Sequence, residues 1–272
     1  MKSLKDKVVV VTGAGSGMGR EISLLCSARG AVVALADYNL ASAEETAALI
    51  AKAGGKTSVH KVDVSDQAAV NRFAAEVVAK HGTVDVLFNN AGIIPKIQRF
   101  EKTSADVFVK MFAVNFYGVL FCTQAFLPEL LKRPEAALVN TSSAAGLVGY
   151  LGLSSYAASK FAVRGFSEAL GMEYHGSGLT VSVVHPGAIN TNIAQNSPFM
   201  TEEDKKAMAS GGGGGIKMLS AAEAARGIVD GMQAKKTRII VGSDAKMQDR
   251  MARLLPQAYT GLIYSKMKDM LE

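Results

Sequence analysis

The sequence has no tryptophan, only two cysteines and no long uninterrupted apolar run among its 272 residues. Cys26 and Cys122 cannot build a disulfide scaffold, and both fall in helix-like stretches, so they are expected to be buried thiols in a reducing compartment. The four valines at 8–11 are too few for the core of a signal peptide, and the apolar segment at 116–131 is interrupted by polar residues and Pro128. These absences predict a cytoplasmic protein without membrane contact.

Charge of one sign is not concentrated anywhere in the sequence. The 30 lysines and arginines exceed the 24 aspartates and glutamates, but they are dispersed, with small clusters at 205–206 and 235–238. A nucleic-acid-binding protein would place basic residues in a stripe with interleaved aromatic side chains, and the sequence has no such stripe. The four histidines are scattered and have no metal-ligand spacing with cysteine or aspartate. Neither a nucleic acid nor a catalytic metal is therefore expected.

The sequence is rich in apolar residues, which are arranged in a strand–helix alternation. Hydrophobic residues make up 49% of the composition and charged residues 20%, which is enough for a sizeable core. Short β-branched runs predict strands at 7–11, 31–36, 57–62, 84–88, 136–141, 179–184 and 238–241. Longer helical periods predict helices at 21–29, 41–53, 68–80, 105–131, 155–173 and 221–233. This alternation predicts one α/β domain over residues 1–272, with a doubly wound, seven-stranded parallel sheet and helices on both faces.

Two segments depart from this alternation. Residues 190–219 contain five consecutive glycines at 211–215, which cost too much backbone entropy for a regular element. This segment is expected to be a mobile excursion that folds over bound substrate. Residues 243–272 form a tail with two helix-like halves separated by Pro256. The tail is expected to pack on its own domain, and the alternatives are capping of a neighbouring subunit's pocket and contact with a membrane face.

A glycine-rich turn, Thr12-Gly13-Ala14-Gly15-Ser16-Gly17-Met18-Gly19, joins the first predicted strand to the first predicted helix. Glycines here let backbone N–H groups approach a pyrophosphate, and the helix offers that anion the positive end of its dipole. Asp37 ends the second predicted strand, where a carboxylate can accept hydrogen bonds from both adenosine ribose hydroxyls and repels a 2′-phosphate. The turn and Asp37 predict a Rossmann-type fold and favour NAD over NADP as the cofactor.

Further motifs follow in chain order on the predicted elements. They are Asp63-Val64, Asn89-Asn90-Ala91-Gly92, Asn115, Ser143 within Asn140-Thr-Ser-Ser-Ala-Ala-Gly146, Tyr156-x-x-x-Lys160 and Pro186-Gly187-x-x-x-Thr191. Together with Thr12-Gly13-x-x-x-Gly17-x-Gly19, this series resembles the motifs of the short-chain dehydrogenase/reductase superfamily. The resemblance is good over residues 5–195 and holds only in outline beyond them.

The resemblance implies a catalytic tetrad of Asn115, Ser143, Tyr156 and Lys160. Tyr156 and Lys160 are four residues apart, so they project from one face of a helix. The Lys160 ammonium and the positive nicotinamide ring are expected to lower the pKa of Tyr156 from about 10, so that its phenol exchanges a proton with an alcohol or ketone. Lys160 is also expected to hold the nicotinamide ribose, and Asn115 to keep a water near Lys160. Ser143 is expected to polarise the substrate oxygen, with Ser142 as the neighbouring candidate.

The resemblance also implies the residues that contact the cofactor. Besides Tyr156 and Lys160, they are Gly13, Ser16, Gly17, Met18, Gly19, Asp37, Asp63, Val64, Asn90, Ala91, Gly92, Pro186, Gly187, Ile189 and Thr191. Asp63 and Val64 are expected at the adenine, and Ile189 and Thr191 at the nicotinamide amide. A loop carboxylate that caps the next turn is the alternative for Asp63.

The substrate pocket is expected over the nicotinamide, outside the carboxyl ends of the strands. Its predicted residues are mostly apolar: Ile94, Ser143, Val148, Tyr150, Leu153, Ile193 and Phe199. The motifs fix no arginine near the reacting centre, which favours a hydrophobic secondary alcohol or ketone over a carboxylate or phosphate. The alternative is that several of these residues belong to the core.

The leading hypothesis is an NAD-dependent dehydrogenase of hydrophobic secondary alcohols that also reduces the ketone. The alternatives are an NADPH-dependent ketone or 3-oxoacyl reductase and a catalytically silent dinucleotide-binding sensor. Asp37 argues against the reductase, and the complete tetrad argues against the sensor. The expected partners are a small-molecule substrate and further copies of the chain, because the apolar face at 112–127 fits the helix pairs through which this family commonly forms homotetramers. A homodimer is the alternative assembly.

Overall fold

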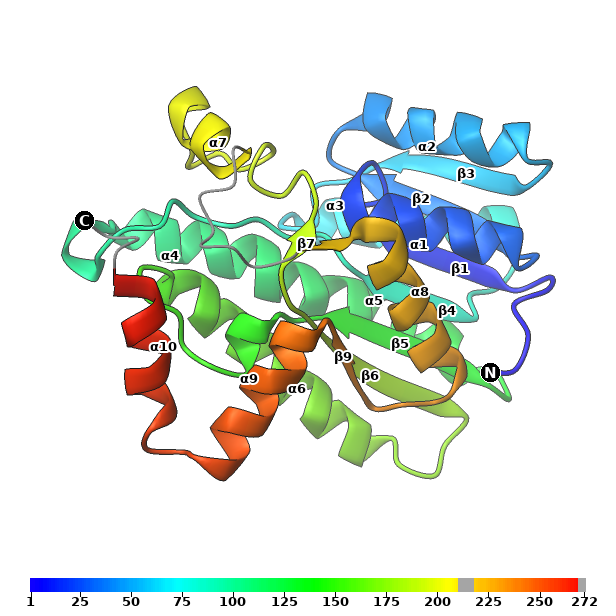
Figure 1. The fold of residues 1–272 in the computed structure, drawn as a ribbon. Helices are drawn as coiled ribbons and strands as arrows, with labels where there is room; N and C mark the ends of the chain where they lie inside the picture. Colours follow the sequence, from blue (N-terminus) through cyan, green and yellow to red (C-terminus); the bar gives the residue numbers. More distant parts are fainter. Residues whose placement is uncertain (210–217, 269–272) are drawn as a thin grey trace.

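The computed structural model describes residues 1–209 and 218–268, with one sheet of seven parallel strands at its centre (Figure 1). The strands are β1 (Val8–Thr12), β2 (Val32–Asp37), β3 (Lys56–Lys61), β4 (Val86–Asn89), β5 (Ala136–Thr141), β6 (Leu179–Pro186) and β9 (Arg238–Val241). Their order in the sheet is β3-β2-β1-β4-β5-β6-β9. The predicted Rossmann-type, doubly wound sheet is thereby confirmed.

The strands are apolar throughout because both faces of the sheet are buried. Successive side chains of a strand point to opposite faces. In β1, Val9 and Val11 belong to one buried hydrophobic cluster, while Val8 and Val10 belong to another. A strand of this kind has no polar face, as expected for a parallel sheet between two helical layers.

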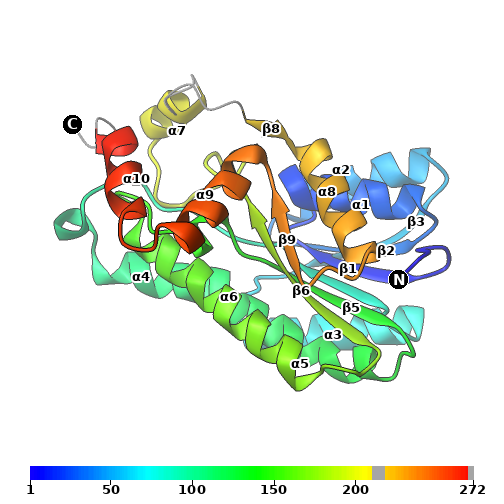
Figure 2. The ribbon, with the colours of Figure 1, turned by 60° about the horizontal axis from the view of Figure 1, so that its bottom comes forward.

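Helices cover both faces of the sheet (Figure 2). One layer contains α1 (Gly17–Ala28), α2 (Leu40–Lys52) and α8 (Ala221–Gln233), and the other contains α3 (Gln67–His81), α5 (Gly118–Leu131) and α6 (Ser154–Glu173). Cys26 and Cys122 are free and buried, one in each layer, and burial raises the pKa of each thiol to about 12. Both cysteines are therefore uncharged core residues.

A continuous helical run covers Ala105–Leu131, as the sequence predicts. It consists of α4 (Ala105–Phe112), a π-helical turn (Ala113–Tyr117) and α5. The run is long and apolar enough to cross a membrane by length and composition, a criterion that core helices of globular proteins also meet. Phe126 and Leu130 are buried against the sheet, so one side of this run belongs to the core.

The segment after β6 forms a small second sheet and a short helix. β7 (Ile189–Asn190) pairs in parallel with β8 (Leu219–Ser220), and α7 (Glu202–Ala209) lies between them in the chain. Of the predicted excursion at 190–219, residues 190–209 and 218–219 are described, whereas the glycines at 211–215 lie outside the described residues.

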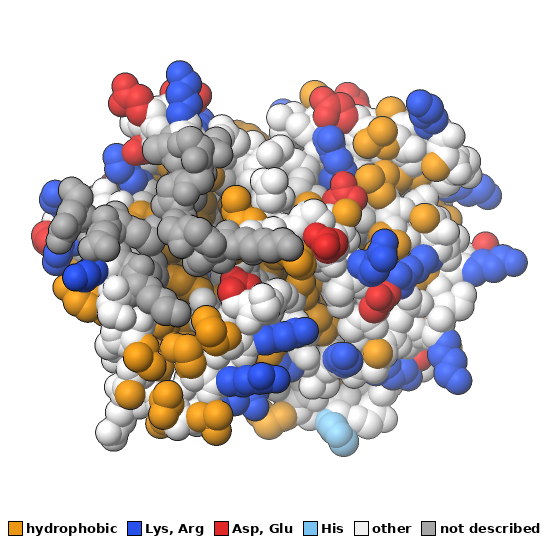
Figure 3. All heavy atoms as spheres, in the orientation of Figure 1, with side chains coloured by type: hydrophobic (Ala, Val, Ile, Leu, Met, Phe, Trp, Pro, Cys, Tyr) orange, Lys and Arg blue, Asp and Glu red, His pale blue; other side chains and the backbone are white. Residues whose placement is uncertain are grey.

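The C-terminal segment forms α9 (Ser243–Leu254) and α10 (Tyr259–Met267), separated at Pro256 as predicted. Ala245 is buried where α9 packs on the rest of the domain. The outer side of both helices exposes large apolar side chains, which gather at the lower left of Figure 3 beside basic side chains. These exposed residues are Met247, Leu254, Leu255, Leu262 and Tyr264.

Two helical glycines, Gly19 in α1 and Gly165 in α6, differ in the space around them. A Cβ on Gly19 would lie 1.9 Å from the carbonyl oxygen of Gly13, whereas a Cβ on Gly165 would meet nothing within 4 Å. Gly19→Ala is expected to lower the free energy of unfolding by about 2 kcal/mol, because overpacking at backbone displaces the turn. The control Gly165→Ala is expected to raise it by up to about 1 kcal/mol. Urea denaturation measures both effects, and equal stabilities of the two variants would contradict the close packing at Gly19.

Candidate active site

A cleft of about 500 Å³ lies at the carboxyl ends of β1 and β4, where the strand order reverses. Such a reversal is the usual ligand position in a doubly wound sheet. The hydroxyl of Thr12, the last residue of β1, accepts the N–H of Asn90 at 3.0 Å and that of Ala91 at 3.1 Å. The predicted cofactor contacts that line the cleft are Gly13, Ser16, Gly17, Met18, Asp37, Asp63, Val64, Asn90, Ala91, Gly92 and Thr191.

The turn after β1 requires glycine because its backbone is left-handed and closely packed. Gly13 and Gly17 have φ angles of +66° and +51°. A Cβ on Gly13 would lie 2.9 Å from the Cα of Ala91, so glycine lets the turn approach the loop after β4. Gly19 does not line the cleft, although the sequence predicts a cofactor contact there. It lies against the Gly13 carbonyl, and its function is to pack α1 on the turn.

The carboxylate of Asp37 lies at the end of β2 beside the glycine turn. Its Oδ2 accepts the N–H of Gly15 at 2.8 Å, and its Oδ1 accepts the N–H of Asn39 at 2.9 Å. Arg20 donates instead to the Gly15 carbonyl at 2.6 Å and to Glu45 at 2.7 Å. Asp37 therefore gives this part of the cleft a negative charge, which favours hydroxyl groups over a phosphate.

Asp63 and Asn90 provide acceptors in the middle of the cleft. Asp63 accepts the N–H and the O–H of Ser65 at 2.9 and 2.6 Å, so it caps its own loop and also lines the cleft. Oδ1 of Asn90 is buried and has no hydrogen-bond partner among the described residues. Since buried polar atoms normally have partners, this oxygen is an acceptor available to a ligand. The lining of the cleft therefore fits a dinucleotide.

The predicted catalytic residues converge next to Gly92. A Cβ on Gly92 would lie 3.2 Å from Oδ1 of Asn115 and 3.3 Å from Nζ of Lys160. Nζ of Lys160 also donates to the Thr141 carbonyl at 3.0 Å and lies 5.7 Å from the ring centroid of Tyr156. Gly92 lines the cleft, whereas the four residues of the predicted tetrad lie next to its lining and are not part of it.

Asn115 is fully buried in the π-helical turn and joins this turn to the loop after β4. Its Oδ1 accepts the N–H of Ile93 at 2.9 Å, and its Nδ2 donates to the Ile93 carbonyl at 3.0 Å. Nδ2 also donates to the hydroxyl of Ser159 in α6 at 3.1 Å. Asn115 therefore fixes the helical run, the loop and α6 relative to one another.

The two candidate serines point to different partners. The Ser142 hydroxyl is buried and donates to the Lys160 carbonyl at 2.8 Å. The Ser143 hydroxyl accepts the N–H of Ala145 at 3.1 Å and is close enough to the Tyr156 phenol to act on its pKa. Ser143 is therefore the serine that lies beside the phenol.

Burial sets the pKa values of the tyrosine–lysine pair. It raises the pKa of Tyr156, and the hydrogen bond with Ser143 acts in the opposite direction. It lowers the pKa of Lys160 to about 8. The sequence predicts a lowered pKa for Tyr156, but in the chain by itself the loss of hydration dominates and the direction is reversed.

An apolar cluster surrounds Tyr156. Its buried members are Met111, Ala145, Leu153, Tyr156 and Ala157, and the partly buried side chains packed on them are Ile93, Ile94, Ile97, Val107, Tyr150 and Phe199. The predicted substrate residues Ile94, Tyr150, Leu153 and Phe199 are thus brought together. Val148 is fully buried outside this cluster, so it is a core residue, and Ile193 lies in the cofactor cleft.

Besides Gly19, Tyr156 and Lys160, three further predicted cofactor contacts do not line the cleft: Pro186, Gly187 and Ile189. A Cβ on Gly187 would lie 2.1 Å from the carboxylate of Asp244 in α9, and Oδ2 of Asp244 accepts the N–H of Ala188 at 2.7 Å. Ile189 packs against the hydrophobic core. The turn after β6 is therefore held by α9, and this contact has no local signal in the sequence.

Other residues of the site come from segments outside the motifs. Those in the cleft are Tyr38, Asn39, Ser42, Lys110, Val114, Asn192, Asn196 and Pro198. The side chain of Gln248 in α9 accepts a hydrogen bond from the Tyr150 hydroxyl at 2.6 Å. Gln248 lies four residues after Asp244, so both project from one face of α9, and this spacing is the one sequence signal that points to Gln248. Within residues 1–209 and 218–268, no group of three or more His, Cys, Asp or Glu could hold a metal ion.

Comparisons with known proteins identify relatives along the whole chain. The family model for short chain dehydrogenases matches residues 7–201. A putative oxidoreductase SadH of Mycobacterium tuberculosis is 37% identical over 265 residues, which are 97% of this chain and 96% of that protein. A meso-2,3-butanediol dehydrogenase of Serratia marcescens is 40% identical over 71% of this chain and 75% of its own length. A cyclohexanol dehydrogenase of Acinetobacter is 33% identical over 68% of this chain and 74% of its own length.

A solved structure has a similar fold over nearly the full length. It is a short chain dehydrogenase/reductase from Burkholderia phymatum in complex with NAD. It is 27% identical, with a TM-score of 0.85, and the match covers 95% of this chain and 97% of that chain. The fold described above is therefore the fold of a known NAD-binding protein.

The buried ammonium of Lys160 is expected to make stability depend on pH. Its pKa of about 8 lies below the ordinary value of 10.5, so between these values the unfolded chain binds more protons and stability rises with pH. Replacing Lys160 by methionine is expected to remove roughly 2 kcal/mol of this rise between about pH 7.5 and pH 9.5. Urea unfolding of the wild type and Lys160→Met at both pH values measures it, and identical pH dependence would contradict a depressed lysine pKa.

Proposed function

Because the chain belongs to the short-chain dehydrogenase family, we propose that it is an NAD(H)-dependent oxidoreductase of hydrophobic secondary alcohols and the corresponding ketones. The observation that carries this proposal is the junction at Gly92. There the end of a dinucleotide-sized cleft meets Asn115 and Lys160, with Tyr156 and Ser143 directly beyond.

The cleft suits NAD in shape and charge. The left-handed Gly13 and Gly17 open the start of α1 to a pyrophosphate, and Asn90 offers a buried oxygen without another partner among the described residues. Asp37 favours the free ribose hydroxyls of NAD over the 2′-phosphate of NADP. When bound, NAD supplies the hydride acceptor for alcohol oxidation, and NADH supplies the hydride for ketone reduction.

Tyr156 is the group that exchanges the proton. In oxidation its phenolate oxygen takes the proton of the alcohol hydroxyl, and in reduction its phenol returns a proton to the ketone oxygen. Ser143 donates a hydrogen bond to the same substrate oxygen and so stabilises the charge that develops there. Burial opposes the phenolate and Ser143 offsets part of that cost, while the Lys160 ammonium lies 5.7 Å from the ring centroid of Tyr156 on the same helix face.

Asn115 and Lys160 hold the geometry of this exchange. The Lys160 ammonium, which lies beside Gly92 and donates to the Thr141 carbonyl, would hold a ribose hydroxyl of the bound cofactor. Asn115 fixes the Ile93 backbone and thereby the wall that faces Tyr156. Rigid placement of these groups lowers the entropic cost of aligning the reacting atoms.

The substrate class follows from the side chains around Tyr156. The cluster on that tyrosine contains aliphatic, methionine and aromatic side chains. Such a wall favours a neutral apolar molecule. The names of two relatives, a butanediol and a cyclohexanol dehydrogenase, are those of neutral secondary alcohols and support an uncharged alcohol as the substrate.

We further propose that the chain assembles with copies of itself. Only 28% of the most apolar window in the run Ala105–Leu131 is buried within one chain. Val109, Tyr117 and Leu131 are among its exposed apolar side chains. A second copy would cover this face with a matching apolar face.

Removal of the Tyr156 hydroxyl tests the acid–base role. Tyr156→Phe is expected to lower kcat for alcohol oxidation at least about a hundredfold, because a positioned acid or base supplies this factor or more. The dissociation constant of NADH, measured by fluorescence, is expected to stay nearly unchanged. Tyr174→Phe, at the C-terminal end of the same helix, is the matched control and should keep wild-type turnover. Wild-type turnover by Tyr156→Phe would refute the assigned role.

Removal of the Asp37 charge tests the cofactor preference. Asp37→Ala is expected to raise the ratio of kcat/KM for NADP+ to that for NAD+ by about tenfold or more, which corresponds to about 1.4 kcal/mol of lost repulsion. Asp66→Asn is the control, because Asp66 caps α3 and does not line the cleft. An unchanged ratio in Asp37→Ala, or a wild type that prefers NADP+, would show that another feature selects the cofactor.

A further inference from the structure

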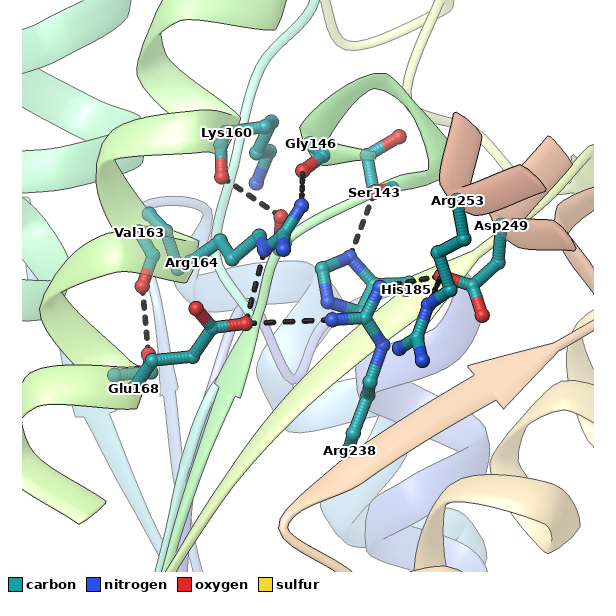
Figure 4. Close-up of polar contacts among 12 residues, drawn as sticks. Ser143, Gly146, Lys160, Val163, Arg164, Glu168, His185, Arg238, Asp249 and Arg253 are labelled. Atoms are coloured by element: carbon teal, nitrogen blue, oxygen red, sulfur yellow. Dashed lines mark hydrogen bonds and ion pairs between the residues drawn. The ribbon is translucent and has the colours of Figure 1, made fainter. Parts of the chain in front are cut away.

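His185 is a fully buried histidine directly behind the catalytic loop. It lies near the end of β6, beside β9, and its Nδ1 is 3.0 Å from the carbonyl oxygen of Ser143 (Figure 4). A carbonyl oxygen only accepts hydrogen bonds, so Nδ1 carries the proton and donates it. None of the catalytic steps above uses this side chain.

Packing alone does not account for a histidine at this position. With the proton on Nδ1, Nε2 is an acceptor, and it has no hydrogen-bond partner among the described residues. A buried polar atom without a partner costs about 1–3 kcal/mol, and a hydrocarbon side chain of similar size avoids that cost. The Nδ1–H donor is therefore the property that distinguishes histidine here.

The surroundings of His185 keep its imidazole neutral. Burial lowers its pKa to about 4, and the positive charges of Arg238 in β9 and Arg164 in α6 act in the same direction. The Ser143 carbonyl and the carboxylate of Glu168 act in the opposite direction and are outweighed. At neutral pH the imidazole is consequently uncharged, with its one proton on Nδ1.

An ion-pair network fixes the arginines around the imidazole. Arg238 donates to Glu168 at 3.3 Å and to Asp249 of α9, and Asp249 also accepts Arg253 at 3.1 Å. Figure 4 shows the imidazole of His185 between the Ser143 loop and this network.

The same network reaches the other end of the catalytic loop. Arg164 donates to Glu168 at 2.9 Å and to the Gly146 carbonyl at 3.4 Å. The short 3₁₀ turn Ala144–Gly146 is thus held at both ends, by His185 at Ser143 and by Arg164 at Gly146.

We propose that His185 is a positioning residue, which holds the backbone of Ser143 and so keeps the Ser143 hydroxyl beside Tyr156. The inference rests on the proposed function, because it assigns His185 to the same reaction. If the backbone of Ser143 moves, its hydroxyl leaves the phenol, and the hydrogen bond that lowers the pKa of Tyr156 is lost.

Two substitutions separate the donor from the bulk of the side chain. His185→Asn can present an amide N–H near the position of Nδ1, whereas His185→Leu fills the space without a donor. His60→Leu is the control, because His60 is also a buried strand histidine but is bonded to Ser58 and Glu76 on β3 and α3.

The kinetic test is the pH dependence of kcat for alcohol oxidation. His185→Leu is expected to lower kcat by about tenfold or more and to move the acidic limb of the profile to higher pH, with an unchanged NADH dissociation constant. His185→Asn is expected to restore most of kcat and the wild-type limb, and His60→Leu to behave as the wild type. A wild-type pH profile in His185→Leu, or equal impairment of His185→Asn and His185→Leu, would overturn the proposal.

Crystal structures of the wild type and both His185 variants give a readout that needs no turnover. The Ser143 hydroxyl should remain hydrogen bonded to Tyr156 in the wild type and His185→Asn and move away from it in His185→Leu. An intact Ser143–Tyr156 contact in His185→Leu would refute the positioning role. A wild type without turnover would contradict the proposed function, and the crystal structures would still decide the role of His185.

Discussion

Gly92 is tightly packed against the predicted catalytic groups, because Asn115 Oδ1 and Lys160 Nζ lie 3.2 and 3.3 Å from the position that its Cβ would occupy. This close approach is what places the catalytic groups at the end of the cofactor cleft. It depends on three elements that meet there: the loop after β4, the π-helical turn that carries Asn115, and α6, which carries Tyr156 and Lys160. A Cβ at position 92 would require Asn115 Oδ1 and Lys160 Nζ to shift by a few tenths of an ångström.

The apolar surroundings of the site determine how its polar groups behave. Burial lowers the pKa of Lys160 to about 8 and raises the pKa of Tyr156, so it disfavours the charged form of both side chains. The hydrogen bonds from Lys160 to the Thr141 carbonyl and between Ser143 and Tyr156 offset part of this cost. In the proposed function, the same apolar wall that makes ionisation costly also favours a neutral substrate. Acid–base chemistry and substrate class therefore have one physical origin.

Much of the fold can be predicted from the sequence because its signals are local. The bounds of β5, α8 and β9 coincide with the predicted ranges, and the turn at Gly13 and Gly17 has the left-handed backbone that its glycines allow. Contacts between distant segments have no such signal. The choice of Ser143 over Ser142 as the serine beside Tyr156 depends on the Lys160 carbonyl, which accepts a hydrogen bond from the Ser142 hydroxyl. Likewise, the turn at Gly187 faces Asp244 of α9, a residue far along the chain. The direction of the Tyr156 pKa shift depends on burial, which only the assembled core determines.

The most direct measurement is the formation of NADH, followed by its absorbance, when the purified protein is mixed with secondary alcohols and either NAD+ or NADP+. The alcohols should range from short aliphatic ones through cyclic and bulky apolar ones to polyols. The account predicts turnover with NAD+ that is fastest for apolar alcohols, because Asp37 faces the cofactor cleft and aliphatic side chains surround Tyr156. Turnover with NADP+ alone, or with polyols alone, would contradict it.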